Sequence, residues 1–226
     1  GNLLLSMMEQ YSGDFLAAVD GLRTLLDCVG RVWPISVEQA TVCAEYDDGS
    51  TTQGEVEVDF EQSRGRRVSR IWLEPEVNIP PAAAAAIPTF DAVIIGPGSF
   101  YTSLVPIFLP NGVREAVAAV DGPIVLVTNL LTEGRGMRGF SVAAAVSRIS
   151  EAIGRGVDVV IVNTGNPGDE SLARYAAEHK EPLPVGDVPD GCEVVTGEFW
   201  RGEFARHARR RLAYAVWGVL SQRLLR

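Results

Sequence analysis

The chain has 226 residues, of which 46% are hydrophobic and 22% are charged, and its net charge at pH 7 is −9. This is the composition of a globular protein that is long enough to bury one sizeable core. An acidic chain is a poor non-specific binder of nucleic acid or of anionic membranes, so we expect neither as a partner.

The first third of the chain predicts a helical pair and then a small group of strands. Helix-period apolar residues indicate helices over Asn2–Glu9 and Phe15–Cys28, with Asp14 as a capping residue of the second. Strands are expected at Ala40–Tyr46, Gly54–Asp59 and Arg70–Glu74, with a turn at Asp47–Gly49. We therefore expect a small antiparallel β insertion at about residues 40–75.

A repeating pattern of strand and helix follows a short helix that begins at Pro80 and Pro81. The predicted pairs are Ala92–Ile95 with Val113–Val120, Ile124–Val127 with Ser141–Ile153, and Val157–Val162 with Glu170–Lys180. Strands that alternate with helices form parallel sheets with right-handed crossovers. With a final helix over Glu203–Leu225, residues 1–226 predict one α/β domain with a three-layer, Rossmann-like, mostly parallel sheet.

The loop after the first of these strands is a candidate phosphate-binding segment. It contains Gly96, Gly98 and Ser99, followed by Tyr101 and Thr102. In open α/β sheets, ligands bind outside the carboxyl ends of the strands, and glycines let backbone N–H groups approach an anion. A tight Gly-Pro-Gly turn without a ligand is the alternative, and Tyr101 fits stacking on a base as well as a place in the core.

The next two strands also end in polar loops, which a parallel sheet places at the same edge. The second loop carries Asn129 and Thr132, and the third carries Asn163. The two asparagines fit a ligand role or a local turn equally well. Arg135 and Arg138, in a glycine-rich segment, either close over an anionic ligand or point into solvent. The meeting of three loops is more specific than any one of them.

Several catalytic classes lack their residues in this sequence. We find no serine, histidine and acid within motif range, no Cys-x-x-Cys pair and no phosphate-loop lysine, because Lys180 is the only lysine. Three cysteines without metal-ligand spacing and the lack of a long apolar run predict a cytoplasmic protein without a membrane span or a metal site. A phosphorylated ligand, bound or transferred, fits best.

The segment Asp91–Ser103, DAVIIGPGSFYTS, resembles the signature of the CofD/YvcK family, which joins 2-phospho-L-lactate transferases to bacterial gluconeogenesis factors. Further pieces resemble that family in order along the chain. They are the opening Gly1–Leu5 with Ser12–Phe15, Gly30–Pro34, Asn129 and Thr132 with Gly139–Ser141, Tyr175-Ala176 with Glu181-Pro182, and Arg206-His207. The resemblance therefore covers nearly the whole chain.

The opening and closing pieces are more similar to the gluconeogenesis-factor branch. That branch implies a regulatory protein that binds UDP-N-acetylglucosamine and is linked to carbon metabolism and to cell-wall growth and shape. The resemblance implies that Tyr175 and Arg206 hold the nucleotide-sugar, and a tyrosine that stacks and an arginine that pairs with a diphosphate suit that role. The alternatives are a phospholactyl transferase of deazaflavin cofactor synthesis, with Mg²⁺ as a possible cofactor, and a non-catalytic scaffold.

Two departures from the family pattern bear on these expectations. The family's opening strand, its G-G-G-T-G loop and its D-D-G-G segment are not in this sequence. We expect the chain to begin inside a longer gene product that carries them upstream, and the alternatives are that they were trimmed away or that a divergent member has lost them. Ala144 and Ala145 stand where the family often has aspartate and histidine, which favours binding over turnover. The C-terminal helix, with Trp217 and Leu220, either packs on its own sheet or docks a second subunit, and we expect a homo-oligomer.

Overall fold

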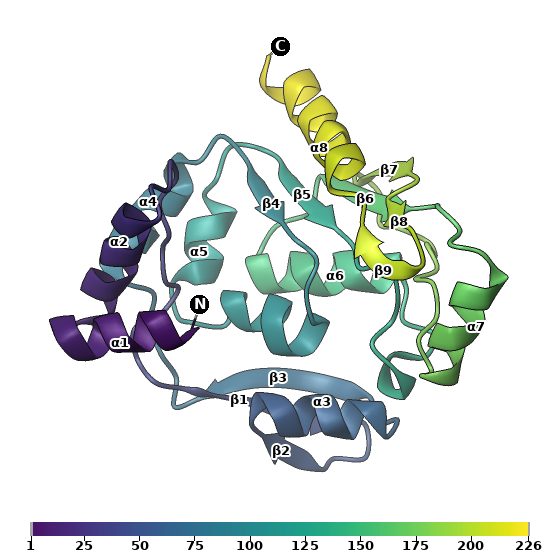
Figure 1. Cartoon of the computed structure of the whole chain (residues 1–226), viewed down its shortest axis with the longest axis horizontal. Coiled ribbons are helices and arrows are strands. Elements are labelled where there is room, and N and C mark those ends of the chain that lie inside the picture. Colours follow the sequence, from purple (N-terminus) through teal and green to yellow (C-terminus); the bar gives the residue numbers. More distant parts are fainter. Residues whose placement is uncertain (1, 226) are drawn as a thin grey trace.

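The computed structural model describes residues 2–225, and its centre is a four-stranded parallel sheet (Figure 1). Its strands, in spatial order, are β4 (Val93–Ile95), β5 (Ile124–Val127), β6 (Val159–Asn163) and β7 (Glu193–Gly197). Every neighbouring pair is parallel, which confirms the predicted sheet. Strand β7 was not predicted, because its residues are exposed or half-buried and form no continuous apolar run.

Helices cover both faces of this sheet, so the molecule has the three predicted layers (Figure 1). Side chains of β5 and β6 alternate between the faces. Leu126 and Val160 face the core shared with α5 (Val113–Ala118) and α6 (Val142–Ile153). Val125 and Val159 face the C-terminal helix, α8 (Arg209–Leu224). All four of these side chains are buried, as expected for strands covered on both sides.

The predicted antiparallel insertion is present, but one of its strands was wrongly placed. The sheet has the order β2-β1-β3, from β1 (Thr41–Tyr46), β2 (Thr51–Gln53) and β3 (Val68–Glu74). Residues 54–59, predicted as a strand, begin the helix α3 (Glu55–Ser63). Val58 is fully buried while Val56 is 74% exposed. An alternating strand would place both on one face, whereas a helix separates them by about 200°.

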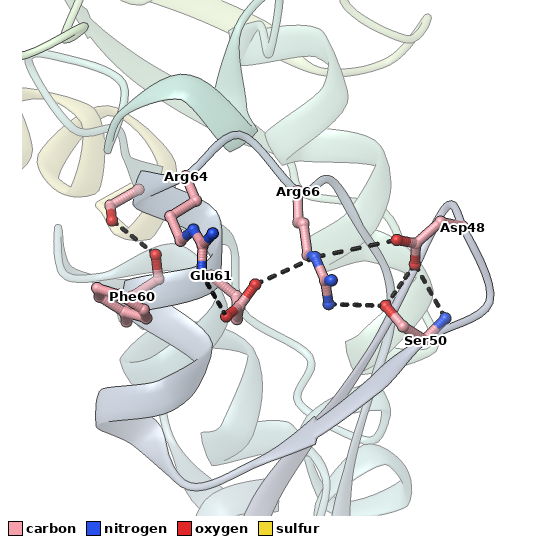
Figure 2. Close-up of polar contacts among 7 residues, drawn as sticks. Asp48, Ser50, Phe60, Glu61, Arg64 and Arg66 are labelled. Carbon is pink, nitrogen blue, oxygen red and sulfur yellow. Dashed lines mark hydrogen bonds and ion pairs between the residues drawn. The ribbon is translucent and has the colours of Figure 1, made fainter.

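Arg66 joins the turn between β1 and β2 to the end of α3 (Figure 2). Its Nε lies 3.1 Å from the Glu61 carboxylate and 3.9 Å from that of Asp48, and its Nη1 donates to Ser50 Oγ at 2.9 Å. Exposed ion pairs of this kind contribute less than about 1 kcal/mol each. Their main effect is to orient α3, which carries side chains into the candidate site described below.

The three-residue turn η4 (Arg135–Met137) lies directly against α3. A Cβ on Gly136 would lie 2.3 Å from the carbonyl oxygen of Arg66 and 2.9 Å from that of Gln62. Only glycine permits this approach. The insertion and the glycine-rich segment after β5 are therefore packed backbone to backbone, although they are far apart in sequence.

The predicted helix Glu203–Leu225 begins later than expected. Residues Phe204–His207 form β9, which pairs with β8 (Trp200–Arg201), and the helix α8 starts at Arg209. Phe204 is 62% exposed, so it does not belong to the apolar side of the helix, whereas Val219 is buried against the sheet and Leu220 packs beside it. No helix within residues 2–225 has both the length and the apolar character that crossing a membrane requires.

The remaining helices agree with the sequence. The pair α1 (Asn2–Ser12) and α2 (Phe15–Leu25) forms a hairpin at one end of the molecule (Figure 1), and Asp14 caps α2 by accepting from the backbone N–H of Ala17 at 2.6 Å. Helix α2 ends three residues before the predicted boundary at Cys28. The short α4 (Pro81–Ala86) starts at its proline, and α7 (Asp169–Ala177) follows β6.

Candidate functional site

The first two polar loops meet at the carboxyl-terminal edge of the sheet, as predicted. Asn129, two residues after the end of β5, accepts from the N–H of Gly98 at 3.1 Å and donates to its carbonyl at 2.8 Å. Both bonds cross to a loop 31 residues away, so Asn129 does not act as a local turn former. Its side chain instead holds the Gly96–Ser103 loop in position.

The carboxylate of Glu133 lies in the place expected for a bound anion. It accepts from the backbone N–H of Phe100 at 3.0 Å, from Ser99 Oγ at 3.3 Å and from Asn129 Nδ2 at 3.0 Å. These are donors of the kind that the sequence assigned to a phosphate. In this structure they are satisfied by an acidic side chain of the same chain.

No basic side chain within residues 2–225 forms an ion pair with Glu133, and its environment makes ionisation costly. Burial is the largest effect and raises the pKa of its carboxyl above the ordinary value, and the nearby charge of Asp59 raises that pKa further. The bonds from Phe100, Ser99 and Asn129 act in the opposite direction. The net direction is upward, so burial outweighs the hydrogen bonds.

Thr102 connects this loop to the insertion. Its Oγ1 lies 3.1 Å from the carboxylate of Asp59 on α3 and 2.6 Å from Ser99 Oγ. Thr102 is buried, as is Gln62 on the next turn of the same helix. Among the residues that the structure describes, the Nε2 of Gln62 has no hydrogen-bond partner, although the residue is 97% buried and lines the cavity described next. An unpaired buried donor of this kind favours a ligand acceptor.

A cavity of about 640 Å³ opens between these residues, and we call it the loop-edge cavity. It brings together the first two loops, helix α3, the end of helix α7 and strand β9. Its lining residues are Asp59, Gln62, Pro97, Gly98, Ser99, Asn129, Leu130, Leu131, Thr132, Glu133, Tyr175, Lys180, Ala205 and His207. Of the predicted site residues, Gly98, Ser99, Asn129, Thr132 and Tyr175 therefore share one cavity.

Two of these residues also hold the cavity wall together. Tyr175 accepts from the backbone N–H of Ala205 at 2.8 Å and lies edge-on to Trp200, with ring centroids 6.1 Å apart. Thr132 is buried and its Oγ1 accepts from the N–H of Glu181 at 3.0 Å. Both side chains thus tie the segments after β5 and α7 to the sheet edge.

Other predicted site residues lie elsewhere. Tyr101 is 5% exposed and packs against Phe100 and Phe140, with ring centroids 5.1 Å and 6.2 Å away, so it does not line the loop-edge cavity. Arg206 is exposed and lies outside the lining, between Ala205 and His207, which are in it. Gly96 directly follows β4 and does not line the cavity either.

The third loop is adjacent and is held both locally and from a distance. Asn163 accepts from the N–H of Gly165 at 3.1 Å, a turn-forming bond, and from the N–H of Phe199, 36 residues away, at 2.7 Å. A smaller cavity of about 240 Å³ lies between this loop and Asn129. The three loops therefore share an edge, but the first two form the candidate site.

Asp59, Gln62, Glu133, Lys180 and His207 line the cavity and were not predicted to do so. Asp59 was placed on a strand, and nothing in the chain order links it to the sheet edge. Glu133 carried a signal, since it is the acidic residue between Asn129 and the glycine-rich segment. Burial lowers the pKa of the His207 imidazole, a change that favours its neutral form.

Within residues 2–225 no group of three or more histidine, cysteine, aspartate or glutamate side chains is arranged to hold a metal ion. Asp59 and Glu133 offer two carboxylates, with the hydroxyls of Ser99 and Thr102 beside them. Oxygen donors of this kind fit Mg²⁺, which takes one or two carboxylates and completes its shell with water or phosphate oxygens.

The model of the family described as "2-phospho-L-lactate transferase CofD" matches residues 1–200. The gluconeogenesis factor of Listeria monocytogenes is 31% identical to this chain, and the match covers 97% of this chain and 69% of that protein. A relative from Aquifex aeolicus is 32% identical, and the match covers 100% of this chain and 71% of the relative. A relative from Thermotoga maritima is also 32% identical, and the match covers 82% of this chain and 58% of the relative.

A solved structure has the same architecture. It is a crystal structure of a protein from Bacillus halodurans described as a member of the UPF0052 family. Its TM-score is 0.86 at 27% sequence identity, and the superposition covers 96% of this chain and 71% of that one. The likeness therefore extends over nearly all of the chain, including the β insertion.

Proposed function

The chain belongs to the CofD family, and we propose that it is a nucleotide-sugar-binding regulatory protein of the gluconeogenesis-factor type. The proposed ligand is UDP-N-acetylglucosamine or a similar nucleotide-diphosphate sugar, bound in the loop-edge cavity. A role in carbon metabolism and in cell-wall growth and shape is part of the same proposal. This role is proposed for the whole protein. The match covers 71% and 69% of the Aquifex and Listeria relatives, so each of them has a part that this chain does not match.

The position of the Glu133 carboxylate carries this proposal. A carboxylate and a phosphate oxygen are recognised by the same donors, namely backbone N–H groups, hydroxyls and amide N–H groups. The loop therefore has the donor geometry for an anion, because it already holds one. A diphosphate that displaced Glu133 would meet the N–H of Phe100, the hydroxyl of Ser99 and the amide of Asn129.

The rest of the loop-edge cavity suits a ligand of this kind. Its volume of about 640 Å³ lies within the usual range of small-molecule sites. Lys180, Tyr175 and His207 come from the segments that follow the sheet edge and provide charge, stacking surface and hydrogen-bonding groups. Gln62 contributes an unpaired amide donor. A contact between Arg206 and the diphosphate stays a prediction.

Calorimetry with UDP-N-acetylglucosamine on the full chain, supported by thermal shift, tests the proposal. We expect wild type to bind and Asn129→Ala to bind at least about tenfold more weakly, since its amide positions the loop through two hydrogen bonds. Asn166→Ala is the matched control, because Asn166 is exposed and bonds only its own turn. No heat and no thermal shift at millimolar ligand would rule the proposal out.

A transferase is the second candidate, and the pair of Asp59 and Glu133 favours it. Their carboxylates suit Mg²⁺, which would neutralise charge during transfer of a phospholactyl group from a nucleotide donor to a deazaflavin acceptor. The test is product formation from these substrates with Mg²⁺, by wild type and by Asp59→Asn. Formation of product that depends on Mg²⁺ and on Asp59 would replace the binding-protein proposal with this one.

A further inference from the structure

A second cavity lies on the far side of the first loop from the loop-edge cavity and shares no lining residue with it. Its volume is about 400 Å³. Its walls come from β3, from the turns η2 (Phe100–Leu104) and η3 (Val105–Phe108), and from α5 and α6. The lining residues are Ser69, Arg70, Ile71, Tyr101, Val105, Phe108, Leu109, Pro110, Asn111, Gly112, Arg114, Glu115, Arg148, Glu151 and Ala152.

Three arginines from three different elements converge on this cavity: Arg70 from β3, Arg114 from α5 and Arg148 from α6. None of them forms an ion pair with any residue between positions 2 and 225. Arg114 instead donates to the backbone carbonyl of Glu151, and Arg148 donates to that of Val68 at 3.4 Å. Each guanidinium therefore keeps N–H groups available for an acceptor in the cavity.

The floor of the cavity is apolar and aromatic. Tyr101 and Phe108 are buried there, and Val105 lies beside them. The guanidinium carbon of Arg148 lies 5.5 Å from the centroid of the Tyr101 ring, a cation–π arrangement that holds this arginine over the floor. Tyr101 is the loop residue that the sequence singled out and that the loop-edge cavity leaves unused.

The charged residues of this cavity favour an anion with a single anionic group over a polyanion. Three arginines against the two glutamates, Glu115 and Glu151, leave one positive charge in excess at this cavity, in a chain whose net charge is −9. A polyanion such as a nucleic acid would meet the glutamates at the rim and is disfavoured. One phosphate or carboxylate group on a flat apolar body matches both the arginines and the aromatic floor.

We propose that this cavity is a separate binding site for a small organic anion, in which Arg148 and Arg70 pair with the anionic group and Tyr101 packs against its apolar body. The site is next to the candidate nucleotide-sugar site but independent of it. The first loop lies between them, since Phe100 donates to Glu133 on one side and Tyr101 lines the second cavity on the other.

Calorimetric titration of the full chain with phenyl phosphate, benzoate and inorganic phosphate at low ionic strength tests the inference. Phenyl phosphate and benzoate distinguish a phosphate from a carboxylate as the preferred group. We expect at least one of them to bind more tightly than inorganic phosphate, which lacks the apolar body. Arg148→Gln should weaken that binding at least about fivefold.

Further variants keep the outcome decisive. Arg70 is exposed, so Arg70→Gln should leave the core intact and the protein folded. This variant should therefore weaken binding measurably even if Arg148→Gln does not fold. Arg210→Gln, a change at an exposed position on α8, should leave binding unchanged. Equal affinity in the Arg70 and Arg210 variants, or no binding of either organic anion, would overturn the inference.

Discussion

The Glu133 side chain takes up the hydrogen-bond donors of the candidate phosphate-binding loop. The hydrogen-bond donors of the loop could be predicted from the sequence: Gly98 gives access to its backbone, and Ser99 and Asn129 supply side-chain groups. The group that accepts from these donors could not be predicted, because whether an acidic side chain reaches a given N–H depends on the path of a glycine-rich segment. Gly134, the next residue, has a φ of 111°, a conformation that turns the chain and places Glu133 against the loop.

Removing the charge of Glu133 while keeping its shape should strengthen nucleotide-sugar binding. In Glu133→Gln the side-chain oxygen still accepts from Phe100, but an entering phosphate no longer meets a buried negative charge. We expect affinity for UDP-N-acetylglucosamine to rise about tenfold by calorimetry, which corresponds to about 1.4 kcal/mol. Glu170→Gln, an exposed acid on α7, is the control. Weaker binding would mean that the carboxylate itself contacts the ligand.

The raised pKa of Glu133 also predicts a pH dependence of stability. Because the folded state holds the proton more tightly than the unfolded state, the favourable contribution of this group is complete below the unfolded pKa of about 4.3 and is lost as pH rises through the higher folded value. The free energy of unfolding of Glu133→Gln minus that of wild type should therefore increase with pH across this window. The slope is at most about 1.4 kcal/mol per pH unit.

Urea unfolding of both proteins from pH 4 upward, in steps of about half a unit, measures this difference. Glu170→Gln again provides the reference for a surface carboxyl. A difference that stays constant with pH would show that the Glu133 carboxyl titrates normally in the folded protein.

At the scale of elements, the strands and helices of the parallel sheet were predictable because apolar runs and helix-period patterns are local signals. Strands β4, β5 and β6 fall where the sequence placed them. The start of α3 was not predictable in the same way. In Glu55–Asp59 the apolar and acidic residues alternate as in a strand, and burial of Val58 and Gln62 on one side becomes visible only with the neighbouring elements present.

Two valines of α3 test this assignment directly. Val58→Ala should lower the free energy of unfolding by roughly 2 kcal/mol, because it removes fully buried methyl groups. Val56→Ala should change it by less than about 0.5 kcal/mol, because that side chain is 74% exposed. Denaturant unfolding of the two variants gives the comparison. Equal losses would indicate that both valines share one buried face, as in a strand.

At the scale of the whole molecule, the three layers explain the contrasting sides of α8. Leu212, Val216 and Leu220 pack with Val219 against the sheet, which agrees with the reading of this helix as part of its own fold. Tyr214 and Trp217 face outward and are 70% and 68% exposed.

Self-association stays a prediction, and the exposed face of α8 is where we expect the interface. Two exposed aromatic rings on one helix are typical of an interface, where large rigid side chains contribute most of the binding energy. We expect the mass in solution to rise with protein concentration, and Trp217→Ala to remove that rise. Light scattering after size exclusion measures it, with Tyr11→Ala, an exposed aromatic change on α1, as the control. A mass that never exceeds that of one chain would contradict the prediction.

The close approach at Gly136 has a consequence for how this sequence can vary. Any side chain there would meet the carbonyl oxygens of Arg66 and Gln62, so the only way to accept one is to separate η4 from α3. Separation would move the segment that carries Glu133 away from the helix that carries Asp59. Substitutions in the β insertion and in the segment after β5 are therefore constrained jointly, and the two segments should diverge among homologues as a pair.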